Sequence, residues 1–79
     1  MSVNSQRRAI EVIDQAQAMG LTAGKDPTGM AAAALYIAGL IEGERRTQQE
    51  VAAAAHITEV TVRNRYKEMV QKLNLKVEV

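Results

Sequence analysis

The sequence predicts a small all-α domain built around one central buried helix, and three observations lead to this expectation. Residues 30–41 form a run of twelve consecutive uncharged residues, and a helix that is apolar on all sides belongs inside a protein. Apolar residues recur at helical spacing before and after this run. The chain of 79 residues has no cysteine, so its stability has to come from packed helices rather than from disulfides or cysteine-bound zinc.

A first helix is expected over residues 6–19. Asn4 or Ser5 offers a side-chain cap for its start, and Gly20 supplies a stop. Its apolar side chains recur at helical spacing; they are Ala9, Val12, Ile13, Ala16 and Met19. The pattern predicts an amphipathic helix that packs against the core.

The central helix is expected over residues 27–41. Asp26 can cap its free N–H groups, Pro27 suits the first helical position, and Gly43 marks its end. The alanines inside it are good helix formers whose small side chains let other helices approach closely. A membrane span is the alternative for such a run, but a span needs about 20 apolar residues. A core helix is therefore favoured.

A short third helix is expected after a charged turn, over about residues 48–55. Thr47 and Glu50 have the spacing of a capping box, in which each side chain bonds the backbone N–H of the other residue. The helix cannot extend much further, because Thr58 supplies another start signal.

The last helix is expected over about residues 59–73, with Thr58 as its cap. One stripe of it is apolar at spacings of three and four, and consists of Val62, Tyr66, Met69, Val70 and Leu73. Residues 76–79 alternate between charged and apolar side chains. They predict either a short extended tail or a disordered end.

The short helix, the turn and the longer helix make a helix-turn-helix candidate over about residues 47–73. The outward face near the start of the last helix carries Val60, Arg63, Asn64 and Lys67. Arginine can give two hydrogen bonds to guanine, asparagine can pair with adenine, and a small apolar side chain can meet the thymine methyl group. We therefore expect Val60, Arg63 and Asn64 to contact DNA bases.

Several residues around this face are suited to the DNA backbone. Thr58 and Thr61 lie where the free N–H groups of the helix start could hold phosphates, and Lys67 adds a positive charge. The net charge is only +1, but residues 63–76 include five basic residues and one acidic residue. The alternative is that the basic stripe is only a solvated face, since paired helices with a tight turn also occur in proteins that never bind DNA.

The sequence does not favour an enzyme. His56 stands in the turn, where this motif often has a glycine. As the only histidine, in a chain without cysteine, it is expected to be a turn residue or a partly buried residue rather than a ligand or a base. No glycine-rich phosphate loop, no nucleophile with an evident base and no paired carboxylates are found. No catalytic site, metal site, cofactor or membrane association is expected, and without a signal peptide pattern an intracellular location is the default.

Four segments carry a family resemblance: GKDPTG at residues 24–29, AAAALYIA at 31–38, TQQEVA at 47–52 and TEVTVRNRYKE at 58–68. In sequence and in order they resemble the second cyclin-like repeat of archaeal transcription initiation factor B, the counterpart of eukaryotic factor IIB. The resemblance covers essentially residues 6–73. It implies that residues 1–79 form a single cyclin-like helical domain, with about four of the five helices of such a repeat.

The resemblance also implies a function, which is that of a promoter DNA-binding module of a general transcription initiation factor. Such a module would bind the B recognition element upstream of the TATA box in the major groove, in complex with TATA-binding protein. RNA polymerase would be recruited through parts of the full-length factor outside this chain. The base-contacting positions of the family fall on Val60 and Arg63, and Thr58, Thr61 and Arg65 are expected at the backbone. The archaeal family implies a cytoplasmic location.

Two other hypotheses remain open. A cyclin-like protein-interaction module without sequence-specific DNA binding would show little salt dependence in partner binding. A stand-alone regulator would need a dimer that presents two half-sites about one helical turn apart. Under the family hypothesis, the remaining helix is expected upstream of Met1, and its absence would leave apolar surface open.

Overall fold

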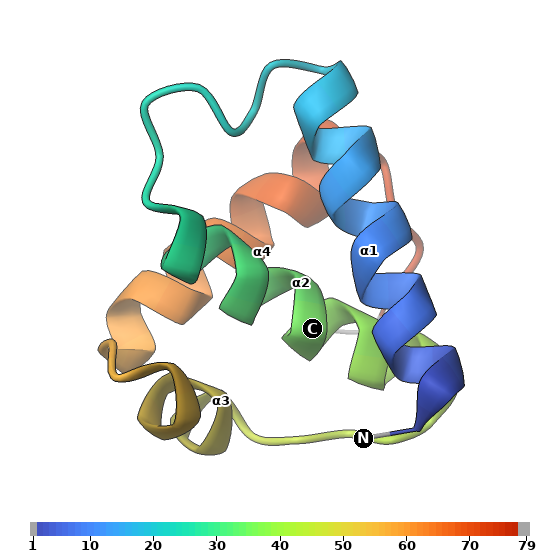
Figure 1. The fold of residues 1–79 in the computed structure, drawn as a ribbon, viewed down its shortest axis with the longest axis vertical. Coiled ribbons are helices and arrows are strands. Elements are labelled where there is room, and N and C mark those ends of the chain that lie inside the picture. The colour runs from blue at the N-terminus through green and yellow to red at the C-terminus, as the bar shows by residue number, and fades with distance from the viewer. Residues whose placement is uncertain (1, 78–79) are drawn as a thin grey trace.

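A computed structural model describes residues 2–77 of the chain (Figure 1). The described residues form four helices and no strand, namely α1 (Val3–Ala18), α2 (Pro27–Glu42), α3 (Gln48–Ala55) and α4 (Glu59–Lys72). The helix α2 contacts each of the other three helices, with α1 to one side of it, α4 behind it and α3 below it in Figure 1. The predicted all-α class and the central position of the uncharged run are both confirmed.

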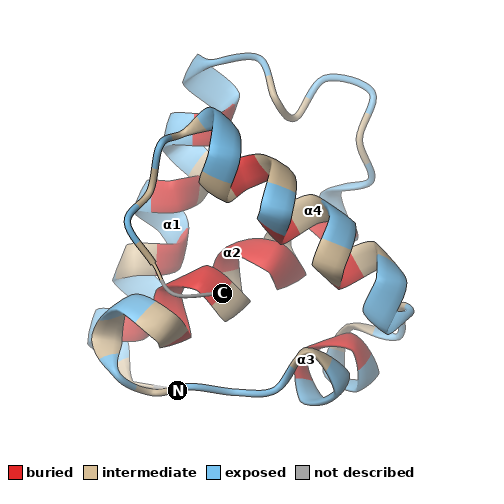
Figure 2. Ribbon diagram, turned by 180° about the vertical axis from the view of Figure 1, so that it is seen from behind, coloured by how far each residue is buried: buried red, intermediate tan, exposed pale blue. Residues whose placement is uncertain are grey.

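The helix α2 is the core of the molecule. Its buried residues include Ala33, Ala34, Ile37 and Ala38, none of which has any exposed surface. Figure 2 shows this burial along most of α2, whereas α1 and α4 are buried on one face only. Because the buried alanines are small, the neighbouring helices can lie close to the α2 axis. The inner face of α4 therefore packs against α2, and its outer face is exposed.

The start of α2 is fixed by the predicted side-chain cap. The Asp26 carboxylate accepts a hydrogen bond from the Thr28 N–H at 3.2 Å, and Pro27 is the first helical residue. At the other end, Gly43 has a φ of 74°, which is the left-handed conformation that glycine adopts without steric cost. Both predicted boundary signals are confirmed.

All four helices end in the same backbone motif. Each is followed by a residue with positive φ, and these residues are Gly20, Gly43, His56 and Asn74. In each case the next N–H donates to the carbonyl five residues back, in the pairs Leu21 to Ala16, Glu44 to Gly39, Ile57 to Ala52 and Leu75 to Val70. This is the Schellman arrangement, which satisfies carbonyl groups that a helix end leaves free. His56 thus adopts the left-handed conformation that a glycine would adopt in the turn before α4.

The predicted start of α1 at residue 6, with Asn4 or Ser5 as the cap, is wrong. The helix begins at Val3, and the Ser2 hydroxyl caps it by accepting from the Ser5 N–H at 3.2 Å. Ser5 is instead a buried residue inside the helix. Met19, expected on the apolar face, lies beyond the last helical residue and is 56% exposed.

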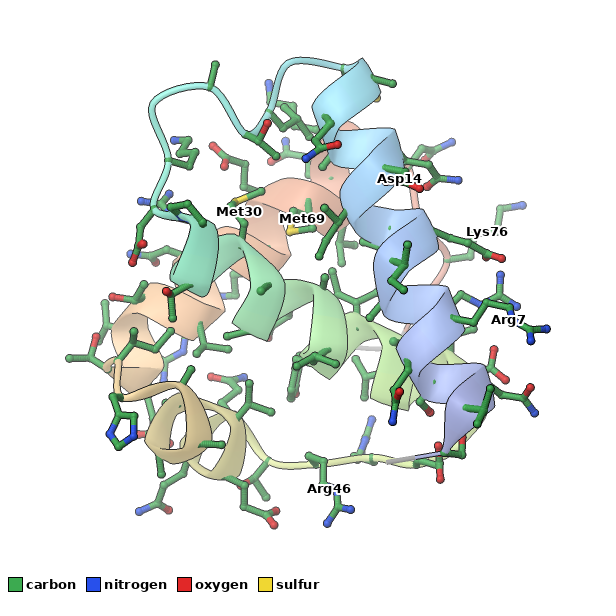
Figure 3. All side chains as sticks on the ribbon, viewed as in Figure 1. Arg7, Asp14, Met30, Arg46, Met69 and Lys76 are labelled. Carbon is green, nitrogen blue, oxygen red and sulfur yellow. The ribbon has the colours of Figure 1, made fainter. Side chains whose placement is uncertain are left out.

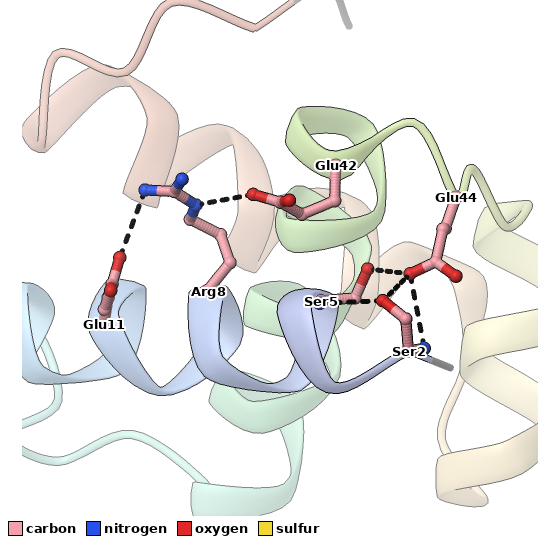
Figure 4. Close-up of polar contacts among 6 residues, drawn as sticks. All are labelled: Ser2, Ser5, Arg8, Glu11, Glu42 and Glu44. Atoms are coloured by element: carbon pink, nitrogen blue, oxygen red, sulfur yellow. Dashed lines mark hydrogen bonds and ion pairs between the residues drawn. The ribbon is translucent and has the colours of Figure 1, made fainter.

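The early start of α1 has a tertiary cause, which Figure 4 shows. The hydroxyls of Ser2 and Ser5 both donate to one carboxylate oxygen of Glu44, just beyond the end of α2. These hydrogen bonds lower the pKa of the Glu44 carboxyl group, and the bond from the Ser2 side chain contributes most, followed by that from Ser5. One turn further along α1, Arg8 donates to Glu42 at 3.0 Å. The first two turns of α1 are therefore tied to the end of α2.

An open apolar groove of about 450 Å³ lies between α2 and α3. Its walls include Ala31 and Leu35 of α2 and Val51 and Ala54 of α3. The groove leaves apolar surface open between these two helices. That a further helix of the repeat would cover such surface stays a prediction.

After α4 the chain leaves regular structure. Residues 75–77 belong to no helix or strand, and residues 78 and 79 of the predicted tail lie outside the described residues. None of the helices described is long and apolar enough to cross a membrane.

Candidate nucleic-acid interface

The helix-turn-helix candidate is built from α3, a turn centred on His56, and α4. The capping box at the start of α3 is present in full, because the Thr47 hydroxyl accepts from the Glu50 N–H and the Glu50 carboxylate accepts from the Thr47 N–H, both at 3.0 Å. The hydrogen bond from the Thr47 N–H is the main reason why the pKa of Glu50 is lowered. The predicted bounds of α3 are confirmed to the residue.

The start of α4 is capped by Thr58, as predicted. Its hydroxyl accepts from the Thr61 N–H at 3.2 Å, and the two threonine hydroxyls lie 2.9 Å apart. A contact between two hydroxyls uses one of their two protons. The other proton remains free to donate, so this pair could still hold a phosphate oxygen. Whether Thr58 and Thr61 contact the DNA backbone stays a prediction.

Three of the predicted DNA-binding residues lie together on the exposed face of α4. Val60 is 55% exposed, and Asn64 and Lys67 are exposed at the positions four and seven residues later, which places all three on one face of a helix. The opposite side of α4 packs into the core through its buried residues, which are Val62, Tyr66 and Met69. Met69 belongs to the same buried core as Met30 of α2, and Figure 3 labels both inside the molecule.

Arg63 lies at the edge of this face and leans toward α3. It is half-buried, and its Nε donates to the side-chain oxygen of Gln48 at 3.2 Å. The Gln48 side-chain nitrogen in turn donates to the Tyr66 hydroxyl at 3.1 Å. Gln48 was not among the predicted site residues. No local pattern could have indicated it, because the contact joins residues 15 positions apart on two helices.

Arg65 is not on the exposed face with Val60. Five residues separate the two, which is a rotation of about 140° around a helix of 3.6 residues per turn. The Arg65 guanidinium lies 4.0 Å from the Glu68 carboxylate, which also pairs with Lys25 at 3.5 Å. Its Nε is buried and has no hydrogen-bond partner. A DNA backbone contact by Arg65 stays a prediction, and it would have to occur on the flank of α4 that faces the start of α2.

Two arginines outside the predicted set lie close to the candidate interface. Arg45 and Arg46, both exposed, line a shallow hollow together with Gln48 of α3 and Glu59 of α4. Figure 3 shows Arg46 on the segment between α2 and α3. Two positive charges at this position add to those of Arg63 and Lys67, and long-range attraction of a polyanion depends on the summed field. In the sequence, the two arginines directly precede Thr47, the first residue of the capping box, which places them beside the start of α3.

The described residues offer no site for a metal ion. Among residues 2–77, no group of three or more histidine, cysteine, aspartate or glutamate side chains is placed to hold one. His56 is exposed in the turn, which agrees with its expected role as a turn residue.

Comparisons with known proteins identify the family. The model of the transcription factor TFIIB repeat matches residues 1–72. Among similar proteins, transcription initiation factor IIB of Pyrodictium occultum is 73% identical over 70 residues, covering 89% of this chain and 23% of that protein. Transcription initiation factor IIB 1 of Thermococcus kodakarensis is 63% identical, and factor IIB of Pyrococcus furiosus is 62% identical. Each of these two covers 100% of this chain, which is 26% of the relative.

The chain therefore spans about a quarter of the length of the relatives that it matches. Those relatives are archaeal transcription initiation factors, and the family is not one of enzymes. The four packed helices are consistent with the cyclin-like fold that the resemblance implied. This protein belongs to the transcription factor TFIIB repeat family.

Proposed function

We propose that the chain is a promoter DNA-binding module of a transcription initiation factor, and that the outer face of α4 contacts base edges in the major groove. One observation supports this most strongly. Val60, Asn64 and Lys67 are exposed along one face over the first turns of a helix whose opposite side is anchored in the core. A major groove admits one α-helix, and the first turns of such a helix make the base contacts.

Each residue of this face has a definite chemical role in the proposal. The Val60 methyl groups would meet a thymine methyl group, the Asn64 amide would pair with adenine, and Arg63 would donate to guanine. Lys67, with Thr58 and Thr61 at the capped start, would bind phosphates and fix the register of the helix. Arg65 is kept as a fourth backbone candidate on the α2 flank.

The names of the relatives support the partners. Because those proteins are initiation factors, we propose that the DNA is the B recognition element upstream of the TATA box and that TATA-binding protein is bound beside it. This would make the chain the second of two cyclin-like repeats. Polymerase recruitment would then fall to other parts of a full-length factor, in the cytoplasm of an archaeal cell.

The groove between α2 and α3 favours a second candidate function. A protein-interaction module of the same fold would use an apolar surface such as that formed by Leu35 and Val51, and its basic residues would be only a solvated face. The two candidates differ in their dependence on salt. Phosphate neutralisation makes the logarithm of DNA affinity fall linearly with the logarithm of salt concentration, whereas apolar docking does not.

Fluorescence anisotropy with labelled duplexes tests the proposal. The chain is titrated, with TATA-binding protein present, into a duplex that carries the intact recognition element and into one with that element scrambled. We expect tighter binding to the intact element, with a log-linear loss on adding salt. Arg63→Ala should weaken intact-element binding by about 1 to 3 kcal/mol and bring the two affinities closer together.

A matched control variant is Arg7→Ala, because Arg7 is an exposed arginine on the outside of α1 (Figure 3). It removes the same charge on a different helix, so it should change both affinities slightly and equally. Equal affinity of the unaltered chain for both duplexes, with no difference between the two arginine variants, would refute the proposal.

A further inference from the structure

We infer that Gln48 of α3 is a positioning residue for Arg63, so that base recognition by α4 depends on a side chain that does not itself touch a base. This inference rests on the proposed binding of DNA by α4. It adds a specificity-determining residue that lies on the other helix of the motif.

The contact is a chain of two hydrogen bonds that ends in the core. Arg63 Nε donates to Gln48 Oε1 at 3.2 Å, and Gln48 Nε2 donates to the Tyr66 hydroxyl at 3.1 Å. Tyr66 is only 3% exposed, and its ring packs against that of Tyr36 with 4.7 Å between centroids. The arginine is therefore connected, through one amide, to a buried aromatic ring.

Only one orientation of the Gln48 amide fits this chain. The Nε–H of arginine is always a donor, so the atom that faces it has to be the amide oxygen. The amide nitrogen then faces the Tyr66 oxygen, which can accept. Turning the amide over would set two donors against each other at Arg63, and such a contact is repulsive. The arginine thus selects the orientation of the amide, the tyrosine hydroxyl accepts from its other end, and the amide in turn holds the arginine.

The consequence concerns how Arg63 can approach a guanine. Its guanidinium has five N–H donors, and Gln48 occupies the one on Nε. The remaining donors are on the two terminal nitrogens, so Arg63 would present its end, rather than its side, to the guanine acceptors O6 and N7. A side chain already held in one conformation also loses less freedom on binding. Immobilising a free one costs roughly 2- to 12-fold in affinity.

A double-mutant cycle of Gln48→Ala and Arg63→Ala tests the inference. Each of the four proteins is titrated into the intact element and into duplexes in which one base pair at a time is exchanged. The base pair at which Arg63→Ala abolishes discrimination is the one that Arg63 contacts. We expect Gln48→Ala to lower discrimination at that base pair by roughly 2- to 12-fold and to leave the other base pairs unaffected.

Gln48→Ala in the Arg63→Ala background should not change the discrimination at any base pair, because the residue that Gln48 positions is absent. An equal effect of Gln48→Ala in both backgrounds would overturn the inference, since Gln48 would then act on DNA or on stability by itself. No effect of Gln48→Ala where Arg63→Ala does abolish discrimination would overturn it too, while the proposed function would stand. No effect of either substitution would overturn the inference together with the proposed guanine contact of Arg63.

Two further variants separate positioning from mere packing. Gln48→Glu provides a rescue, because its carboxylate can accept from both the Arg63 Nε–H and the Tyr66 O–H. This variant should keep the discrimination at the base pair that Arg63 contacts. Its negative charge should weaken binding to every duplex alike. Tyr66→Phe keeps the ring and removes the hydroxyl, so it should lower discrimination at that base pair only. A glutamate variant that behaves like Gln48→Ala would contradict the inference.

Discussion

Replacing His56 by glycine should stabilise this protein, although the turn then loses its side chain. His56 has φ 59° and ψ 41°, and a left-handed conformation costs an L-residue about 1 to 2 kcal/mol. Glycine avoids that cost but loses about 0.5 to 1 kcal/mol more backbone entropy on folding. The difference is a gain between about 0 and 1.5 kcal/mol, and its midpoint of about 0.75 kcal/mol corresponds to about 3 to 6 °C in melting temperature for a chain of this length.

Gly43→Ala is the matched reverse experiment. Gly43 has φ 74°, and a Cβ atom added there would meet no other atom within 4 Å, so only the backbone terms change. The same two terms then predict a loss between about 0 and 1.5 kcal/mol, with a midpoint of about 0.75 kcal/mol. His56→Val should also lose stability, because a β-branched residue is poorly tolerated at positive φ.

Urea denaturation followed by far-UV circular dichroism measures all three variants, with the free energy of unfolding obtained by linear extrapolation. Because glycine preserves the backbone path of the turn, duplex discrimination by the His56→Gly variant should equal that of the unaltered chain. A loss of stability on His56→Gly, together with no loss on Gly43→Ala, would refute the conformational reasoning.

Three further predictions concern the core, one acidic side chain and one cap. Ile37→Ala should lose about 2 to 5 kcal/mol in urea denaturation, because Ile37 is 0% exposed at the centre of α2; a loss under about 1 kcal/mol would contradict this. The pKa of Glu44 is lowered in the folded state, so on acidification the unfolded chain binds a proton at this carboxylate before the folded chain does. The stability that Glu44 adds to the fold is therefore complete above the unfolded pKa of about 4.3, and it is lost as the pH falls through the lower folded pKa. In acid, the melting temperature of Glu44→Gln should therefore fall less steeply with decreasing pH than that of the unaltered chain. Equal slopes for the two proteins would count against the contact of Glu44 with Ser2 and Ser5. Thr58→Ala should lose about 1 kcal/mol and Thr58→Ser much less, and equal stabilities in denaturation would argue against the cap.

The boundaries of three helices could be predicted because their signals are local. Asp26, Thr47 and Thr58 each cap a helix through an N–H two or three residues away, so a short stretch of sequence contains the whole interaction. The start of α1 depends instead on Glu44, which lies 39 residues beyond Ser5. Serine at residues 2 and 5 looks equally suitable as a cap, and only the position of the α2 end distinguishes them.

Which residues share a face of the candidate interface could also be predicted, but only where the arrangement is local. The spacing of Val60, Asn64 and Lys67 is enough to place them on one face of a helix. The placement of Arg65 on another flank could also have been foreseen, since it follows from the same period. The Gln48 contact to Arg63 could not, because it depends on how α3 crosses α4 and on the side-chain conformations that the core allows.

Amide chemical shifts test most directly the central claim that the outer face of α4 is the DNA-binding surface. The ¹⁵N-labelled chain is titrated with the intact duplex and unlabelled TATA-binding protein, and then with the scrambled duplex. We predict that the shift changes which distinguish the intact from the scrambled duplex fall within residues 58–67, with smaller ones at the start of α3. Changes centred on α1, with the amides of Val60, Arg63 and Asn64 unmoved, would contradict the account.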